Sequence, residues 1–250
     1  MIEKLHQFLF PFPKVKGVTD EDREKIQQCV HGLKYTGNHI SEAFVLLDNT
    51  RHEIALLHAP GIRFYNQPKQ AFSFLEEQSI FMEDDMALMP TLRHLFINKW
   101  KKLGNADYYF LHFTELYIRN LNYKLPSYIK IVPVIVNDSG DVLVVMMLVG
   151  KCHVDHQHEY LLYDPWKHHG YEWVGGAEKV EWKEVDFSYK RPIYEEIMQL
   201  MQCGLDQESA AKKLRLNINT FKRYLMDMRK TYACQSTEGL NIKLHILGFK

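Results

Sequence analysis

Four basic side chains near the C-terminus have the types and spacing for a defined chemistry. They share one side of a single helical pattern and are Lys222, Arg223, Arg229 and Lys230. Guanidinium and ammonium groups donate hydrogen bonds to guanine O6 and N7 in the major groove and to backbone phosphates. This face therefore predicts a polyanionic partner, provided that neighbouring helices hold it open to solvent.

The helix that carries this face has a start signal and an apolar side of its own. Asn217 is placed to cap its N-terminus. Phe221, Leu225 and Met228 follow at i, i+4 and i+7, which puts them on one stripe opposite the basic one. The sequence thus predicts an amphipathic helix with one buried side and one basic side.

Two shorter helical patterns come before it. Four apolar residues form the stripe of the first: Ile193, Ile197, Leu200 and Met201. Gly204 ends this helix, and Asp206 is the expected N-cap of the second. The inward side of the second is small, with Ala210 and Ala211 ahead of Leu214. Two helices that cross steeply over a tight turn need such small residues, so the pattern predicts a helix-turn-helix whose second helix enters the major groove.

The pattern GL-x4-AA-x2-L-x-L-N-x2-TFK, over residues 204–222, resembles the C-terminal DNA-binding domain of LuxR-type transcription regulators. That family has a Glu-Val-Leu helix, a Gly, an Ala-x2-Leu and a Ser-x2-Thr-Val-Lys in this order. The matching segments here are Glu196–Met198, Gly204, Ala211–Leu214 and Asn217–Lys222. The resemblance covers about a quarter of the chain.

Three positions depart from the family pattern. Arg215 stands where the family has its turn glycine, and a non-glycine residue in the left-handed conformation costs roughly 1 kcal/mol or more. Ser209 replaces the usual acidic residue, and Arg191 with Tyr194 replaces the family's start of the first helix. These departures concern contact geometry more than the fold.

The resemblance implies a role for each polar residue of the basic helix. Lys222 and Arg223 match the positions nearest the base edges, with Met226 one turn on. The residues placed to hold phosphates are Thr220, Arg229 and Lys230. Lys212 and Lys213 in the second helix are either backbone contacts or a solvated face.

A fourth helical pattern follows, over about Thr237–Ile246. It favours this family over a sigma-factor-like helix-turn-helix, which normally ends with its recognition helix. In the family the extra helix supplies a dimer contact, which implies Leu240 and Leu244 here. Because one helix-turn-helix covers only a few base pairs, a homodimer on double-stranded DNA is expected.

The charge of the chain divides near residue 187. The formal net charge of the 250 residues is zero, but from Phe187 onward eleven Lys and Arg stand against six Asp and Glu, a net of +5. The remainder carries −5, as expected when only one domain meets a polyanion. The predicted domains are 1–186 and 187–250. No C-x2-C pair and no membrane-length apolar run occurs, which predicts a cytoplasmic protein without disulfides or structural zinc.

The first 186 residues predict an α+β domain. The expected elements are an irregular arm over 1–18, a helix over 19–33, strands 43–47 and 53–58, helices 70–77 and 90–103, strands 107–118, 128–136 and 141–149, and a hairpin of 160–163 with 171–174. This order resembles a PAS-like sensor domain. The fold class is therefore α+β, with an N-terminal PAS-like antiparallel sheet and helices, and a C-terminal all-α four-helix helix-turn-helix domain. The resemblance implies sensing of a small-molecule ligand or dimerisation.

Two segments carry expectations about packing. Strand 142–149 is apolar at nearly every position, so both faces of the sheet need a cover, from the N-terminal helix or from a second subunit. We expect this strand to hold the homodimer together in the absence of DNA. Segment 179–189 alternates apolar and charged residues without Gly or Pro, so a packed connection is expected, with Trp182 against the sheet.

Other chemistries have less support in the sequence. The histidine-rich segment 153–169 has the residue types of a metal site, but an extended, turn-rich segment does not make its ligands converge, and no metal is expected. No nucleophile elbow, phosphate loop or H-E-x2-H motif occurs, so neither catalysis nor a cofactor is expected. The aromatic strand 108–117 lines a ligand pocket or forms core, and core is favoured. The contrasting hypothesis is an interaction module with a degenerate helix-turn-helix that does not bind DNA.

Overall fold

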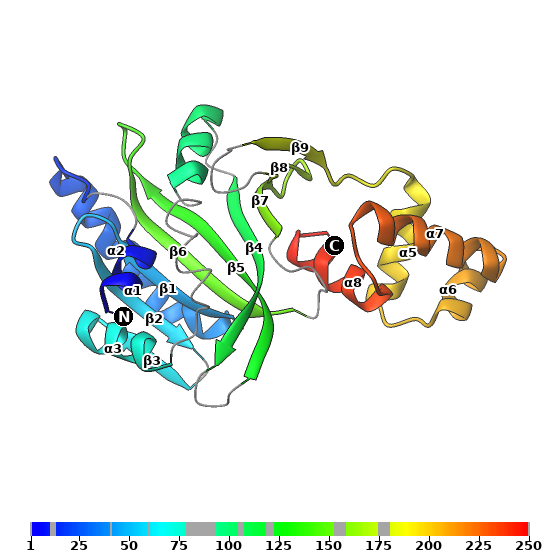
Figure 1. Ribbon diagram of the computed structural model, residues 1–250, viewed down its shortest axis with the longest axis horizontal. Coiled ribbons are helices and arrows are strands. Elements are labelled where there is room, and N and C mark those ends of the chain that lie inside the picture. The colour runs from blue at the N-terminus through cyan, green and yellow to red at the C-terminus, as the bar shows by residue number, and fades with distance from the viewer. Residues whose placement is uncertain are drawn as a thin grey trace.

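The computed structural model describes residues 2–10, 14–40, 42–59, 61–78, 94–104, 108–118, 123–152, 159–174 and 181–249. Figure 1 shows a large antiparallel sheet with helices on its faces, followed by a group of C-terminal helices beside one end of the sheet. The helix α8 lies nearest the sheet, while α6 and α7 lie on the side away from it (Figure 1). The molecule is thus mixed α and β, as the sequence predicts.

One sheet joins all nine described strands, and every pairing in it is antiparallel. Its strands are β1 (Ala43–Asp48), β2 (Glu53–Ala59), β3 (Ile62–Tyr65), β4 (Tyr109–Ile118), β5 (Tyr123–Val136), β6 (Val142–Lys151), β7 (Glu159–Asp164), β8 (His169–Trp173) and β9 (Trp182–Asp186). Their order is β3-β2-β1-β6-β5-β4-β7-β8-β9. The predicted strands are confirmed, β5 begins five residues earlier than expected, and the edge strands β3 and β9 were not predicted.

The N-terminal helices are α1 (Ile2–Leu9), α2 (Asp20–Thr36), α3 (Pro68–Gln78) and a helix over 94–103. The prediction of an irregular arm over 1–18 is wrong for residues 2–9, which form α1 and bury Leu5 and Leu9 on the sheet, and it is confirmed for the described residues 14–18. The predicted start of α2 is confirmed by a capping box. Thr19 N donates to Asp22 Oδ2, and Asp22 N donates to Thr19 Oγ1, both at 3.1 Å.

Both faces of the sheet are covered from within the chain. On one face, helices α1, α3 and 94–103 pack over residues such as Val45, Ile131 and Phe110. On the other face, α2 covers the half around Phe44 and Leu143, and the C-terminal helices cover the half around β4 and β7. Five residues of β6 are buried: Val142, Leu143, Val144, Val145 and Met147. The expectation that strand 142–149 holds a dimer together is therefore wrong, since helices of the same chain occupy its faces.

The C-terminal helices follow the predicted pattern closely. They are α5 (Pro192–Gln202), α6 (Gln207–Lys213), α7 (Ile218–Thr231) and α8 (Thr237–Ile246). Asp206 accepts hydrogen bonds from Glu208 N and Ser209 N at 3.0 and 2.9 Å, and Asn217 accepts one from Asn219 N at 2.8 Å. Both predicted caps are confirmed.

Arg215 stands at the position where the family pattern has a glycine. It takes the left-handed conformation, with φ of 57°. It ends α6 in a Schellman motif, in which Arg215 N donates to Lys212 O at 3.1 Å and Leu216 N to Ala211 O at 2.9 Å. The backbone geometry of the turn is thus kept without glycine, at the cost of strain at one residue.

Replacing Arg215 with glycine is expected to raise the free energy of unfolding by about 0.5–1 kcal/mol. The substitution removes the left-handed strain of an exposed residue, and part of that gain is offset by the entropy of glycine in the unfolded chain. The control is Lys213→Gly, in the right-handed last turn of α6, which should lose about 1 kcal/mol instead. Urea unfolding of the full chain measures the free energy of unfolding of both variants. A lower free energy of unfolding for both would contradict the assignment of strain to Arg215.

The sheet and the C-terminal helices meet in one continuous hydrophobic cluster. At its centre is a group of rings that we call the aromatic seam: Tyr163, His168, Phe187, Tyr189, Tyr232 and Phe249. Tyr232 Oη donates to the Phe187 carbonyl at 2.6 Å, and His168 stacks on Phe249 with centroids 3.9 Å apart. The predicted packed connection between the two parts is confirmed.

Two further contacts fix the connection. Trp182 opens β9, pairs with Trp173 of β8 and packs on the core beneath the sheet, as its alternating segment predicts. Lys243 of α8 is fully buried, and its Nζ donates to the Tyr232 carbonyl at 3.0 Å while lying 5.4 Å from the centroid of the Phe113 ring. The ammonium group thereby joins α8, the C-terminal end of α7 and the sheet.

Candidate functional site

The basic face of α7 is open to solvent at three of its four basic residues. Lys222, Arg223 and Lys230 are exposed, and none of them forms an ion pair within the part of the chain that the structure describes. Met226 is 48% exposed between them, and Thr220 is half-buried near the start of the helix. These side chains are therefore available to a ligand as the sequence predicts.

The opposite side of α7 anchors the helix. Phe221, Leu225 and Met228 are buried, as predicted. Ala210 and Ala211 of α6 are also buried in the same cluster, which brings the backbones of α6 and α7 close together across the turn. The rigid apolar side holds the basic side in a fixed orientation.

Arg229 differs from the other basic residues of α7. Its side chain is half-buried, and Nη2 donates to the carbonyl of Gln235. The guanidinium group thus braces the turn between α7 and α8. The sequence groups Arg229 with the residues that hold phosphates, and the structure adds this internal contact to that assignment.

Lys212 and Lys213 lie exposed in the last turn of α6, directly before the Arg215 turn. Their positive charges interact favourably with the negative, C-terminal end of the α6 dipole. Both alternatives from the sequence, a backbone contact or a solvated face, fit this position.

An arginine–tyrosine group beside α7 was missed in the sequence. The guanidinium carbon of Arg191 lies 5.8 Å from the ring centroids of both Tyr194 and Tyr224, and that of Arg223 lies 5.8 Å from the Tyr224 ring. These are cation–π distances. The start of α5 therefore brings a further arginine against Tyr224 of α7, next to Arg223, and only the departure of Arg191 and Tyr194 from the family pattern signalled it.

The expected dimer contact on α8 is not exposed in this structure. Leu240 and Leu244 are fully buried in the cluster that joins the helices to the sheet. The prediction that they supply a dimer contact is wrong for this arrangement, because the sheet occupies the apolar side of α8. Tyr109 Oη, which donates to the Ile246 carbonyl at 3.4 Å, marks the same contact.

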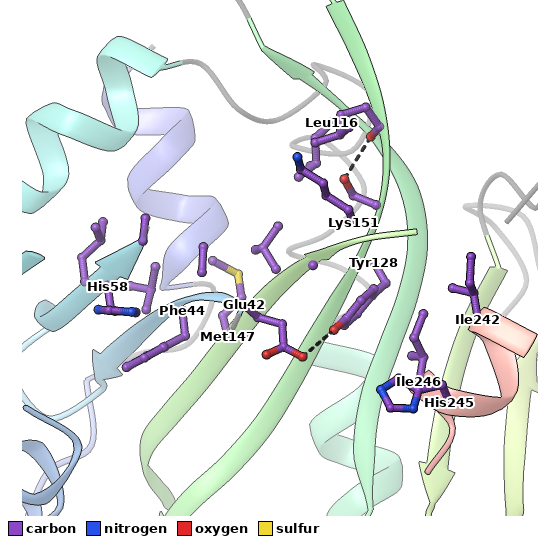
Figure 2. Close-up of a pocket in the computed structure, with 18 of the residues that line it drawn as sticks. Glu42, Phe44, His58, Leu116, Tyr128, Met147, Lys151, Ile242, His245 and Ile246 are labelled. Atoms are coloured by element: carbon purple, nitrogen blue, oxygen red, sulfur yellow. Dashed lines mark hydrogen bonds between the residues drawn. The ribbon is translucent and has the colours of Figure 1, made fainter. Parts of the chain in front are cut away.

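A cavity of about 1080 Å³ lies at the end of the sheet where β1 begins and β6 ends. Figure 2 shows Glu42 and Tyr128 between residues of the sheet and residues of α8. Tyr128 Oη donates to Glu42 Oε1 at 2.9 Å. Burial, followed by the charge of Glu42, raises the pKa of the Tyr128 phenol, so this hydroxyl stays a donor.

Glycine at position 150 makes room for the Tyr128 ring. A Cβ added at Gly150 would lie 2.4 Å from Cε1 of Tyr128. A larger residue here would push the ring out of place. The position of the Tyr128 hydroxyl over Glu42 therefore depends on this glycine.

The predicted core role of the aromatic strand is confirmed where the structure describes it. Tyr108, Tyr109, Phe110 and Phe113 are buried. The side chain of Tyr117 lies outside the described residues. The cavity of about 1080 Å³ is lined from this strand by Leu116, and a smaller one of about 200 Å³ is lined by Tyr109.

The histidine-rich segment lies partly outside the described residues, which omit 153–158. His168 accepts or donates a hydrogen bond with Tyr163 Oη at 2.9 Å, and His169 Nε2 lies 2.7 Å from Glu184 Oε1. In the described part of the chain, no three His, Cys, Asp or Glu side chains are grouped as metal ligands would be. Within the same ranges, no helix has the length and apolar character to cross a membrane.

Comparisons with known proteins give only a loose likeness. No family model and no curated protein matches the sequence. Among solved structures, phage VqmA bound to DPO has a TM-score of 0.32 and 11% identity over 92% of both chains. The VqmA dimer of Vibrio cholerae without target DNA, described as a LuxR-type receptor, has a TM-score of 0.30 and 11% sequence identity over 87% of this chain and 88% of that one. The complex of Vibrio cholerae VqmA with ligand and DNA has a TM-score of 0.29 and 10% sequence identity over 86% of both chains.

Proposed function

We propose that this protein is a sequence-specific DNA-binding transcription regulator. The carrying observation is the exposed basic face of α7, which contains Lys222, Arg223 and Lys230 and is held in place by the buried side of the same helix. In the proposal, α7 lies in the major groove of double-stranded DNA. Lys222 and Arg223 read base edges with Met226 beside them.

The remaining basic residues hold the backbone in this proposal. Phosphate contacts come from Thr220, Lys230 and Arg229, with Lys212 and Lys213 at the end of α6. The Arg191 group at the start of α5 adds positive charge beside Tyr224 of α7. Such contacts set the register of the protein on the duplex, and the base contacts select its sequence.

The N-terminal part is proposed to be a PAS-like domain that senses a signal or drives dimerisation. The strands β1 and β2, with the short edge strand β3, are followed by helices and then by β4, β5 and β6. Because β1 pairs with β6, the first and last of these strands meet in the middle of one sheet. This arrangement supports the element order on which the PAS-like hypothesis rests.

The proposal further comprises a homodimer on two DNA half-sites, a cytoplasmic location, and a function without catalysis. The four cysteines, all among the described residues, form no disulfide, and two of them are buried. Both apolar surfaces that the sequence offers for dimerisation are covered in this structure, so the dimer contact lies elsewhere or forms after rearrangement. Sedimentation with and without DNA measures the number of chains bound.

The test of the proposal is the salt dependence of binding to duplex DNA. Replacing Lys230 with alanine is expected to weaken binding to all sequences alike and to make the slope of log K against log salt shallower by about one. The physical reason is that one phosphate contact, and the counterion that it releases, is lost.

The control is Lys183→Ala, an exposed lysine on the edge strand β9. This substitution removes one positive charge from the sheet, as Lys230→Ala removes one from α7, and it should leave the slope of log K against log salt unaltered. Equal slopes for wild type and Lys230→Ala would remove Lys230 from the interface. If the wild-type chain does not bind duplex DNA at all at low salt, the interaction-module alternative replaces the proposal.

A further inference from the structure

One exposed apolar side chain lies on the basic face of α7. Met226 is 48% exposed, and it is one of four large apolar or aromatic side chains that are exposed in the part of the chain that the structure describes. The other three, Tyr35, Trp166 and Val174, lie before residue 187. Exposure alone does not assign a partner to Met226, but its position among the basic residues of α7 does.

The helical spacing places Met226 in one line with two lysines. Lys222, Met226 and Lys230 follow at i, i+4 and i+8, and all three are exposed. The acidic residue of the same helix, Asp227, is half-buried and interacts with Tyr194 of α5. The exposed line of α7 thus carries positive charge at both ends and one apolar group at its centre.

The major groove of DNA offers a methionine one kind of favourable contact. The base edges there present hydrogen-bond donors, hydrogen-bond acceptors and one methyl group, on C5 of thymine. A thioether has no hydrogen to donate, is only a weak acceptor, and has no charge to pair with a phosphate. Its favourable contact in the groove is therefore with the methyl group, since this contact removes apolar surface of both partners from water.

We propose that Met226 reads the C5 methyl group of thymine in the major groove and is a specificity-determining residue beside Lys222 and Arg223. The proposal rests on the DNA-binding function proposed above and names a base that this face selects. It extends to 5-methylcytosine, which carries a methyl group on the same ring carbon. The DNA preference of the protein then depends on a methyl group as well as on hydrogen bonds.

The rise of the helix sets the distance between the methyl contact and the guanine contact. At about 1.5 Å per residue, Met226 lies about 4.5 Å along the helix axis from Arg223 and about 6 Å from Lys222. Successive base pairs are about 3.4 Å apart. For a helix that lies along the groove, the thymine is therefore expected about one or two base pairs from the guanine that Arg223 reads.

The experiment starts from the duplex that the full-length wild-type chain enriches from a random-sequence pool. Each thymine of this duplex is replaced in turn by deoxyuridine, which removes the methyl group and keeps every hydrogen-bonding group. At the position that Met226 contacts, the replacement should weaken binding by about fourfold, the effect of one buried methyl group. In a second series, cytosine and 5-methylcytosine are compared at that position, and the methylated duplex should bind about fourfold more tightly.

Two substitutions at residue 226 separate the methyl contact from a general loss of binding. Met226→Gln keeps the length of the side chain and replaces its apolar tip by an amide, so it should bind the thymine and deoxyuridine duplexes equally. Met226→Leu keeps an apolar tip and should retain a preference for thymine. The matched control is Lys230→Ala, which should weaken both duplexes and keep the fourfold ratio between them. Circular dichroism verifies that each variant is folded, as expected for exposed positions.

The outcomes separate this inference from the proposed function. A preference for thymine that is lost in Met226→Gln and retained in Met226→Leu supports the inference. If the wild-type chain enriches a sequence but binds its thymine and deoxyuridine duplexes equally, or enriches a sequence without thymine, the methyl contact is overturned and the DNA-binding function stands. The same preference in wild type and Met226→Gln overturns the assignment to Met226. A chain that enriches no sequence and binds no duplex overturns both.

Discussion

Replacing Arg223 with alanine is expected to weaken binding to the preferred DNA site by about 5- to 150-fold, which corresponds to about 1–3 kcal/mol. Arg223 is exposed on α7 next to Lys222 and lies against the Tyr224 ring, 5.8 Å from its centroid. The ring limits the freedom of the guanidinium group, which favours a bidentate contact with guanine. Binding to random duplexes should fall much less, so that sequence preference is relaxed.

The matched control is Arg223→Lys, which keeps the positive charge and loses the planar pair of donors. It should keep most of the affinity for random duplexes and still lose preference for the specific site. Titration of both duplexes with wild type and both variants measures this. An equal loss on specific and random duplexes for Arg223→Ala would show that Arg223 is only a phosphate contact.

Replacing Phe249 with alanine is expected to cost about 3–5 kcal/mol of the free energy that holds the C-terminal helices on the sheet. Phe249 is 4% exposed, stacks on His168 and meets the edges of Tyr189 and Tyr232. The substitution removes the ring that touches both the β7–β8 turn and the connection to α5. It therefore acts on docking more than on either part alone.

Two optical signals distinguish docking from folding. All four tryptophans lie before residue 187, so tryptophan fluorescence follows the sheet part, while far-ultraviolet circular dichroism also follows the C-terminal helices. In wild type, the two urea transitions should coincide, and in Phe249→Ala they should separate. The control is Tyr35→Ala, an exposed aromatic on α2, which should change stability by less than about 0.5 kcal/mol. Coincident, unshifted transitions in Phe249→Ala would refute the role of the seam.

The sequence alone determined the local structure of the C-terminal helices. Caps such as Asp206 and Asn217, the end of α5 just before Gly204 and the apolar stripe of α7 depend on residues within one or two turns of each other. Interactions over such short distances in the chain act in any tertiary context, so spacing and residue type suffice to predict them. The availability of Lys222, Arg223 and Lys230 followed, because the side opposite a buried stripe faces solvent.

Only the tertiary structure decided which helices and strands bury each apolar surface. Trp182 belongs to an edge strand because β8 lies beside it, Leu240 and Leu244 face the sheet in place of a second copy, and α1 forms on the sheet although its sequence suggests an arm. The shared cavity between β6 and α8 likewise joins residues about ninety positions apart. Such contacts depend on the closure of long loops and on competition between apolar surfaces for the same face, and neither is encoded in a local pattern.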